Sequence, residues 1–268
     1  MYDIVLSVVT YNNPVSMLDG VVKSARKTAL KLKIVFVDNS NNQQIREYCL
    51  KEQVDYLLPE SNIGFGSAHN FAMREYSGLA RYFLVCNPDI EIHPGALEKL
   101  TGFMDKNPEV SLSAPLVVNP DGTIQYVHKR LPAPHIFLAR RFFPAALKKL
   151  IKRELDLYEL KDQDFKRPIE VPSMSGCFMF FRSEAIQRIG GFDPRYFMYA
   201  EDIDITREAA KVGRTVLFPD AKVTHLWARG SYFNLKLMLY NIHSIYLYFT
   251  KWGPDSRSEI KEYPCQYQ

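Results

Sequence analysis

Short apolar runs alternate with longer amphipathic segments over the first third of the chain. Residues 4–11 and 33–37 are nearly continuous apolar and β-branched runs, a pattern typical of strands buried on both faces. Residues 15–29 carry apolar side chains at helical spacing. The alternation continues with a helix at 43–51, a strand at 55–58, a helix ending near 76 and a strand at 82–86. This regular order predicts an α/β fold with a doubly wound, parallel sheet.

The pattern becomes less regular beyond Pro94. A helix is expected at residues 96–107, followed by a hairpin of two strands, 112–118 and 123–127, around a Pro-Asp-Gly turn. The remaining predicted elements are strands at residues 170–171, 174–181 and 215–218 and helices at residues 185–189, 205–212 and 235–252. Residues 225–231 are predicted to form a loop.

Composition and charge narrow the class of protein. Apolar residues make up 47% of the 268-residue chain and charged residues 24%, which is typical of a soluble globular protein. The net charge of +4 is too mild to indicate a nucleic-acid partner. The four cysteines are widely spaced, which favours reduced cytosolic thiols over a disulfide framework or a zinc site. No signal-like segment opens the chain, and no apolar run approaches the ~20 residues of a membrane-spanning helix.

Polar residues directly follow three of the predicted buried strands. Thr10, Asp38 and the triplet Asn87-Pro88-Asp89 lie at carboxyl ends of strands, where parallel sheets bind their ligands. Asp38 either closes an Asx-type turn or accepts a hydrogen bond from a nucleobase N–H. The triplet either forms a β-turn with proline at its second position or delivers Asp89 as a ligand for Mg²⁺ or Mn²⁺, held together with substrate phosphates.

Two further features depend on the fold for their interpretation. The segment 62–70 contains two glycines, but His69 replaces the third glycine of a dinucleotide-binding fingerprint. It is therefore either a plain loop-to-helix turn or a backbone that approaches a ligand closely. His225 stands far along the chain, and a single histidine is more often structural than a ligand. It becomes a candidate metal ligand if the fold brings it near Asp89.

Three carboxylates crowd the start of a predicted helix, those of Glu201, Asp202 and Asp204. Acidic residues at a helix start cap N–H groups and face the positive end of the helix dipole, which explains one carboxylate better than three. The alternatives are a metal site, a general base, or a base with supporting groups.

The segment 129–153 is strongly basic and interleaved with apolar residues. It contains no acidic residue and eight cationic ones, Lys129, Arg130, Arg140, Arg141, Lys148, Lys149, Lys152 and Arg153. It is either a solvated cationic face or an amphipathic segment on a membrane surface, and the interleaved aromatic residues favour the membrane. The last predicted helix carries an apolar stripe formed by Leu235, Leu239, Ile242 and Tyr246. This stripe would join the membrane surface, pack in the core or form a dimer contact.

Six motifs in this order resemble the inverting, nucleotide-sugar-dependent glycosyltransferases of family 2, which have the GT-A fold. The resemblance covers nearly the whole chain and is greatest to the bacterial rhamnosyltransferase-like enzymes of cell-surface polysaccharide assembly, such as that of O-antigen. The matching motifs are Val8-Val9-Thr10-Tyr11-Asn12, Val37-Asp38-Asn39-Ser40, Asn62-Ile63-Gly64-Phe65-Gly66 with Asn70, Asn87-Pro88-Asp89, Ser175-Gly176, and Gly190-Gly191-Phe192-Asp193 with Tyr199-Ala200-Glu201-Asp202-Ile203-Asp204.

The resemblance implies a fold and a division of labour along the chain. It implies a single GT-A domain over residues 1–268, with a Rossmann-like, mostly parallel central sheet flanked by helices. Residues 1–118 would bind the nucleotide sugar. Residues 119–268, which contain the basic segment 129–153, would bind the acceptor through C-terminal helices.

The resemblance also implies roles for single residues. Asp202 would be the general base, with Glu201 and Gly176 beside the acceptor, while Asp204 would serve the helix dipole and capping. The triplet that ends in Asp89 takes the place of the family's Asp-x-Asp motif. Its first Asp is Asn here, so Asp89 would hold Mg²⁺ or Mn²⁺ with phosphates and His225. The donor-binding residues would be Thr10, Tyr11, Asn12, Asp38, Asn39, Asn62, Gly64, Asn70, Asn87, Pro88 and Asp89.

The implied reaction moves a sugar from a nucleotide to an acceptor in cell-surface polysaccharide synthesis. The subgroup implies dTDP-L-rhamnose as donor, with a UDP-hexose as the alternative, and a glycan or a polyprenyl-diphosphate-linked acceptor. Such a protein would lie in the cytoplasm, peripheral to the inner face of the cell membrane. Other hypotheses are an inactive copy that serves as a membrane or polyanion adaptor, and a nucleotidyltransferase. The nucleotidyltransferase is disfavoured because residues 11–14 contain no side chain that would bind a phosphate. The sequence predicts no oligomeric state.

Overall fold

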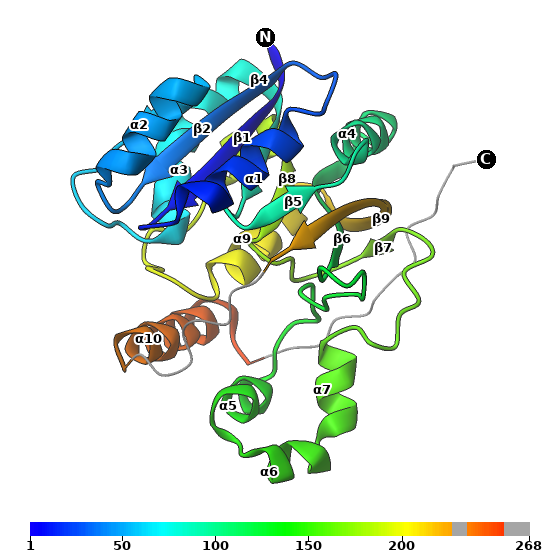
Figure 1. Cartoon of the computed structure of the whole chain (residues 1–268). Coiled ribbons are helices and arrows are strands. Elements are labelled where there is room, and N and C mark those ends of the chain that lie inside the picture. Colours follow the sequence, from blue (N-terminus) through cyan, green and yellow to red (C-terminus); the bar gives the residue numbers. More distant parts are fainter. Residues whose placement is uncertain (227–234, 255–268) are drawn as a thin grey trace.

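Nine strands form one mixed sheet in the part of the chain that this computed structural model describes, residues 1–226 and 235–254 (Figure 1). The strands are β1 (Tyr2–Thr10), β2 (Leu32–Asp38), β3 (Asp55–Leu57), β4 (Ala80–Cys86), β5 (Ile90–Ile92), β6 (Val110–Val118), β7 (Ile169–Glu170), β8 (Phe178–Arg182) and β9 (Arg214–His225). Their order is β3-β2-β1-β4-β8-β6-β9-β5, with β7 also paired to β9.

The sheet changes character along this order. Strands β3, β2, β1 and β4 are all parallel, as the alternation of strand and helix predicts. Beyond them, β8 runs antiparallel to both β4 and β6, and β9 is parallel to β6 but antiparallel to β5. The parallel half thus provides the edge at which ligands of α/β sheets bind.

Helices pack on both faces of the sheet. They are α1 (Val15–Ala25), α2 (Gln43–Glu52), α3 (Phe65–Tyr76), α4 (Ala96–Lys106), α5 (Pro134–Phe142), α6 (Ala145–Leu150), α7 (Lys152–Tyr158), α8 (Ser183–Ile189), α9 (Glu201–Ala210) and α10 (Leu235–Trp252), with the 3-10 helix η1 (Ser77–Leu79). Apolar residues of α1, α2 and α4 pack on one face, and those of α3, α8 and α9 on the other. No helix in the described residues has both the length and the apolar character needed to cross a membrane.

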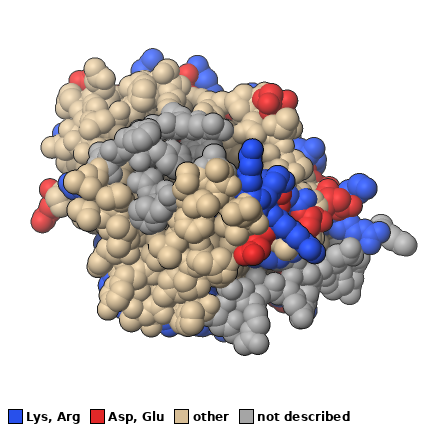
Figure 2. Space-filling view, turned by 90° about the horizontal axis from the view of Figure 1, so that it is seen from below, with Lys and Arg blue, Asp and Glu red and all other residues tan. Residues whose placement is uncertain are grey.

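Helices α5, α6 and α7 form a lobe at the end of the molecule where α10 also lies (Figure 1). The ring of Phe137 on α5 meets the rings of Tyr248 and Phe249 on α10 edge-on. Tyr248 is in turn buried against Tyr196 and Ile203, so a small separate core attaches α10 to the start of α9. Figure 2 views this end of the molecule, where Lys and Arg gather with acidic side chains on one part of the face and a broad part carries neither.

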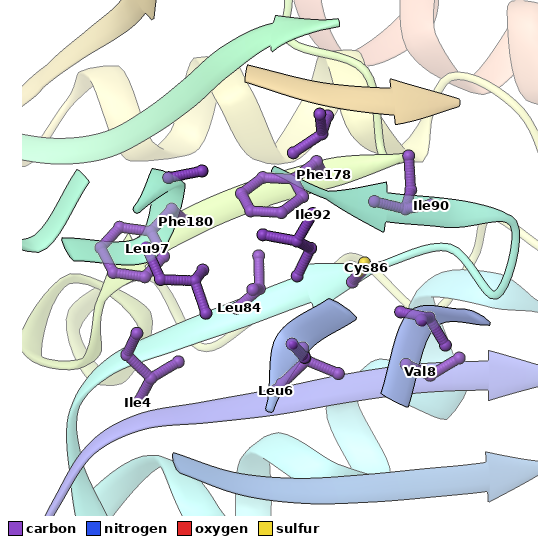
Figure 3. Packing of buried hydrophobic residues seen from close by; sticks show 14 of the residues in the cluster. Ile4, Leu6, Val8, Leu84, Cys86, Ile90, Ile92, Leu97, Phe178 and Phe180 are labelled. Atoms are coloured by element: carbon purple, nitrogen blue, oxygen red, sulfur yellow. The ribbon is translucent and has the colours of Figure 1, made fainter. Parts of the chain in front are cut away.

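The main core explains the continuous apolar runs of the first third. Side chains along a strand point alternately to its two faces. Ile4, Leu6 and Val8 of β1 therefore pack on one face with Leu97 of α4 (Figure 3), whereas Val5 packs on the opposite face with residues of α3. Because both faces are covered, every position of the strand favours an apolar residue.

Several predicted elements are wrong in extent. Strand β9 continues to His225, which is therefore the last residue of a strand and not part of a loop; residues 227–231 of the predicted loop lie outside the described residues. The predicted strand 123–127 is reduced to one isolated bridge between Val118 and Ile124. Helix α9 begins at Glu201, four residues before its predicted start at Ile205, so the crowded carboxylates lie in its first turn.

Candidate active site

The carboxyl ends of the parallel strands meet at one edge of the sheet. Thr10, the last residue of β1, is paired in register with Asp38, the last residue of β2. The backbone N–H of Asn39 donates to the carbonyl oxygen of Thr10 (2.9 Å). On the other side of β1, the Asn87 N–H donates to the carbonyl oxygen of Cys177 (2.9 Å), which brings the segment before β8 to the same edge. The predicted strand-end residues are therefore neighbours.

Asp38 is fully buried, and both of its carboxylate oxygens accept hydrogen bonds. Oδ1 accepts from the hydroxyls of Thr10 (3.2 Å) and Ser40 (2.5 Å) and from the Ser40 N–H (2.9 Å). Oδ2 accepts from the Asn42 N–H (2.7 Å) and the Tyr56 hydroxyl (2.9 Å). Burial alone would raise the pKa of Asp38, but these hydrogen bonds outweigh it and lower the pKa below its usual value. The carboxylate thus holds the loop after β2, and its contact with a nucleobase stays a prediction.

The residues after Thr10 present an aromatic ring at this edge. The Tyr11 side chain is 60% exposed. Asn12 has a φ of 54°, and its N–H donates to the Ser40 hydroxyl (3.0 Å) while its side-chain oxygen accepts from Asn42 Nδ2 (3.3 Å). The turn after β1 is therefore tied to the loop after β2, with the ring of Tyr11 open for stacking on a planar ligand.

Asn39 connects this edge to the loop before α3. Its Nδ2 donates to the Gly64 carbonyl oxygen (3.0 Å), and its Oδ1 accepts from the Ile63 N–H (3.4 Å). Asn62 Oδ1 accepts from the Gly64 N–H (3.0 Å). Gly64 has a φ of 85°, and a Cβ there would lie 2.2 Å from the carbonyl oxygen of Phe197. Only glycine fits, so the loop packs directly against the segment that leads into α9.

Asn70 performs a similar task on α3. Its Nδ2 donates to the Phe192 carbonyl oxygen (2.7 Å), and its Oδ1 accepts from the Phe192 N–H (2.8 Å). Gly191 has a φ of 88°, and a Cβ there would lie 2.4 Å from the same amide oxygen. These contacts make Asn70 a positioning residue for the turn after α8, and its predicted contact with the donor stays a prediction.

His225 lies next to Asp89, as a shared metal role requires. Pro88 and Asp89 form a half-buried turn between β4 and β5. Ile90, which follows, pairs in register with His225 at the end of β9. As a result Nε2 of His225 lies 3.3 Å from Oδ1 of Asp89, and the Leu226 N–H donates to the Asp89 carbonyl oxygen (2.9 Å). The fold therefore brings His225 near Asp89, which is the condition under which the sequence makes it a candidate metal ligand.

Gln125 orients the imidazole and is not predicted by any sequence signal. Its Nε2 donates to Asn119 Oδ1 (2.8 Å), so its Oε1 is the atom that faces Nδ1 of His225, at 2.6 Å. An acceptor at Nδ1 places the proton there and turns the Nε2 lone pair toward Asp89. Two facing acceptors repel each other unless a proton or a metal cation lies between them, so the donor set suits a small cation.

The described residues provide no third protein ligand. Among residues 1–226 and 235–254, no group of three or more His, Cys, Asp or Glu side chains converges on a metal position. A divalent cation at Asp89 and His225 would therefore complete its coordination with water or substrate oxygens, as Mg²⁺ commonly does at phosphate sites.

Asp202 lies in the first turn of α9 and is held by backbone N–H groups. The Gly176 N–H donates to Oδ2 (3.1 Å), and the Ile203 N–H donates to Oδ1 (2.9 Å). A Cβ at position 176 would lie 3.0 Å from the Phe65 ring, so a side chain there would move the N–H that positions Asp202. Gly176 therefore acts through Asp202, whereas its predicted contact with an acceptor stays a prediction.

Glu201 and Asp202 have different environments although they are adjacent. The Glu201 side chain is buried, and its Oε2 has no hydrogen-bond partner among the described residues. Burial, and then repulsion from Asp202, raises the pKa of Glu201 to about 8. Burial also raises the pKa of Asp202, but its N–H donors and then the charge of Lys129 favour its ionised form. The ionised form is therefore better supported at Asp202 than at Glu201.

The backbone before α9 is strained. Tyr199 and Ala200 have φ values of 75° and 61°, which costs residues with a side chain about 1–3 kcal/mol each. Helix α10 holds this turn, because the Ser244 hydroxyl donates to the Met198 carbonyl oxygen (2.8 Å). Strain that the surrounding structure maintains next to a buried carboxylate is typical of a functional site.

Asp204 lies in the first turn of α9, as its predicted role at the helix dipole requires, but it also has tertiary partners. Its buried carboxylate accepts from Lys251 Nζ (2.8 Å) and Trp252 Nε1 (2.7 Å) at the end of α10. The sequence could not indicate this contact, because α10 reaches α9 only through the tertiary fold. Asp204 anchors α10 beside the candidate base.

The predicted basic face is partly neutralised. Acidic residues just beyond 129–153 pair with several of its cations: Lys129 and Arg140 with Glu159, Arg130 with Asp162, and Lys152 with Asp156. The structure places the segment in the α5–α7 lobe, where it remains interleaved with exposed apolar side chains such as Leu147 and Leu150.

Fold and site together define a GT-A-type glycosyltransferase domain. Residues 6–190 match the family model described as glycosyl transferase family 2, and the chain belongs to this family. The solved structures that it resembles have this fold. A mannosyltransferase from Pyrobaculum calidifontis, in complex with GDP-Man and Mn²⁺, superposes with a TM-score of 0.63 at 14% identity over 96% of this chain and 66% of that one. GalNAc-T7 with UDP, GalNAc and Mn²⁺ gives a TM-score of 0.61 at 17% identity over 84% of this chain and 44% of that one.

Two curated relatives are similar in sequence. The N-acetylglucosaminyl-diphospho-decaprenol L-rhamnosyltransferase of Mycobacterium tuberculosis (strain CDC 1551 / Oshkosh) is 30% identical over 182 residues, which cover 63% of this chain and 58% of that protein. The low-salt glycan biosynthesis hexosyltransferase Agl10 of Haloferax volcanii is 25% identical over 179 residues, which cover 66% and 53%. The chain thus spans little more than half the length of these relatives.

Proposed function

We propose that the protein is an inverting glycosyltransferase that transfers L-rhamnose from dTDP-L-rhamnose to a lipid-linked glycan. The observation that carries this proposal is the approach of His225 to Asp89 at the carboxyl edge of the sheet, together with the half-buried carboxylate of Asp202, which the Gly176 N–H holds. The sugar and the acceptor rest on the relative named as a rhamnosyltransferase of a diphospho-decaprenol acceptor. A UDP-hexose remains the alternative donor.

The donor would occupy the edge formed by the ends of β1, β2 and β4. The exposed ring of Tyr11 would stack on the base, and the loops held by Asp38 and Asn39 would shape the nucleotide pocket. Asp89 and His225 would hold Mg²⁺ or Mn²⁺, and such a cation, when bound, offsets the negative charge that develops on the leaving diphosphate. Gln125 would keep the imidazole in the tautomer that presents Nε2.

The acceptor would approach from the side of α9. The hydroxyl oxygen of the acceptor forms a bond to C1 of the sugar while the bond from C1 to the diphosphate oxygen breaks. Asp202 accepts the proton that this hydroxyl loses. A single displacement inverts the anomeric carbon and requires no enzyme nucleophile. Burial raises the pKa of Asp202, which makes it a stronger base than an exposed aspartate. Protonated Glu201 can donate a hydrogen bond to an acceptor oxygen.

A lipid-linked acceptor would be reached from a membrane surface. Leu235, Leu239, Ile242 and Tyr246 form one exposed stripe on α10. Exposed apolar residues of α6 alternate with cations such as Lys149, at the end of the molecule seen in Figure 2. Apolar side chains that enter the interface, flanked by cations that face anionic lipid headgroups, are the signature of interfacial helices. We place this end of the protein on the anionic, cytoplasmic leaflet.

A nucleotide-sugar screen tests the donor and the reaction class. The thermal unfolding midpoint is measured with dTDP-L-rhamnose, UDP-glucose, UDP-GlcNAc and GDP-mannose, each with and without Mn²⁺, because a ligand that binds only the folded state raises it. Slow release of dTDP from dTDP-L-rhamnose supports a transferase. If no nucleotide sugar is stabilising or hydrolysed, the chain is better explained as a membrane adaptor.

A further inference from the structure

Three cations converge on one carboxylate beside the buried ring of Tyr158. Nζ of Lys129, Nε of Arg140 and Nζ of Lys161 lie 3.7, 3.9 and 2.8 Å from the carboxylate of Glu159. Lys129 Nζ and Arg140 Cζ each lie 5.4 Å from the centroid of the Tyr158 ring. The aromatic ring thus supports two of the three cations at fixed positions.

Negative charge is scarce around these groups. Lys161 also lies 2.9 Å from Asp156, which pairs with Lys152 as well. Of the described residues in this cluster, four cations therefore share two carboxylates. Burial, and then the neighbouring charge of Arg140, lowers the pKa of Lys129 to about 8, while the carboxylates of Glu159 and Asp202 act in the opposite direction.

The cluster lies next to the candidate base. Lys129 forms an antiparallel bridge with Ser173, and its N–H donates to the Ser173 carbonyl oxygen (2.8 Å). Two residues after Ser173, the Ser175 N–H donates to Nδ1 of the buried His128 (3.3 Å). The following N–H, that of Gly176, is the donor that holds Asp202. The chain that carries Lys129 is therefore aligned with the chain that positions Asp202.

We propose that Lys129, Arg140 and Lys161 bind the diphosphate of a lipid-linked acceptor, with Glu159 occupying that anion position in its absence. Guanidinium and ammonium groups are the usual ligands of diphosphates, and several around one site provide a strong charge-assisted contact. The cluster lies beside the segment that holds Asp202, the side from which the acceptor would approach. The exposed leucines of α6, Leu147 and Leu150, belong to the same α5–α7 lobe and suit a hydrocarbon chain. This inference rests on the proposed function, because it identifies the acceptor of that same site.

The test measures binding of farnesyl diphosphate by calorimetry while dTDP and Mn²⁺ saturate the donor site. Farnesyl monophosphate and inorganic pyrophosphate are the comparison ligands. We expect the diphosphate to bind, the monophosphate to bind at least tenfold more weakly, and pyrophosphate to bind more weakly than the lipid diphosphate. If pyrophosphate binds as tightly, the site takes a free diphosphate and the assignment to a lipid acceptor is wrong.

The variants separate charge recognition from loss of structure. Lys129→Met and Arg140→Met should each weaken farnesyl diphosphate at least tenfold, and Lys129→Arg should retain most of the affinity. Glu159→Gln should tighten binding several-fold, because it removes the competing anion; a damaged fold would not do this. Lys51→Met, at an exposed position on α2, is the control and should change nothing.

Two outcomes overturn the proposal. The first is binding within twofold of the wild type in both Lys129→Met and Arg140→Met. The second is displacement of farnesyl diphosphate by dTDP with Mn²⁺, which would place it in the donor site. A wild-type protein that releases no dTDP from dTDP-L-rhamnose would instead contradict the proposed function, so the two failures are distinguishable.

Discussion

Lys251 Nζ, at the end of α10, lies 2.8 Å from Oδ1 of Asp204, two residues after the candidate base. The same ammonium group lies 2.9 Å from Glu208 and 3.5 Å from Asp193. Asp204 is almost completely buried. One lysine therefore joins the last turn of α10 to α9 and to the turn before it, and α10 is part of the structure that positions Asp202.

Replacing Lys251 should destabilise the fold. Lys251→Met leaves the carboxylate of Asp204 buried without its cation, and breaking a buried pair in this way costs about 3–5 kcal/mol. Because Lys251 is partly exposed and Trp252 still donates to Asp204, we expect a loss of about 2 kcal/mol in the free energy of unfolding. Urea denaturation measures it. Lys51→Met should cost less than about 0.5 kcal/mol, and an equal loss in both variants would contradict the assigned role.

Asp202→Asn should abolish transfer while the donor still binds. The amide cannot accept the hydroxyl proton, and loss of a general base reduces turnover by about 10²–10⁴-fold. The carboxylate contacts Gly176 and Ile203, neither of which is among the residues proposed to bind the nucleotide, so the dissociation constant of dTDP should change less than about threefold. Calorimetry with dTDP and a transfer assay measure the two effects. Turnover near that of the wild type would exclude Asp202 as the base.

The parallel half of the fold follows directly from the sequence, whereas the site does so only in part. Continuous apolar runs predict β1, β2 and β4, because a strand covered on both faces favours apolar residues at most of its positions. The contact between Asp89 and His225 depends on β5, a three-residue strand too short to give a periodic signal. The partners Gln125 of His225, Tyr56 of Asp38 and Lys251 of Asp204 are joined by tertiary contacts between distant segments, and no local pattern encodes such contacts.

Gln125→Leu should weaken metal binding without touching either ligand. The leucine leaves Nδ1 of His225 without its acceptor, so the imidazole loses its preferred tautomer and orientation. Loss of such a supporting hydrogen bond reduces metal affinity by about 10–100-fold. Titration with Mn²⁺ in the presence of dTDP, followed by electron paramagnetic resonance, measures the affinity. His135→Ala changes an exposed histidine of the lobe and should leave it unaltered. Equal affinity in the wild type and Gln125→Leu would remove His225 from the metal site.

Membrane attachment should depend on the exposed stripe of α10. Leu239→Ser with Ile242→Ser removes two large apolar side chains at its centre, both of them exposed. We expect co-sedimentation with vesicles containing phosphatidylglycerol to fall at least fivefold, since each buried side chain contributes about 1.5–3 kcal/mol. Leu50→Ser, at an exposed position on α2, is the matched control. Unchanged sedimentation of the double variant would show that another surface meets the membrane, or none.

The pH dependence of transfer should respond to Lys129. Asp202 must be ionised to accept a proton, and burial raises its pKa, so turnover falls as the pH falls through that pKa. The positive charge of Lys129 favours the ionised carboxylate and holds the pKa of Asp202 lower than burial alone would. Lys129→Met removes that charge, so the pKa rises further and the acid limb of the kcat profile moves to higher pH. The profile is measured at saturating acceptor, with Lys51→Met as the control. An acid limb that stays in place, or moves to lower pH, would show that Lys129 does not act on the base.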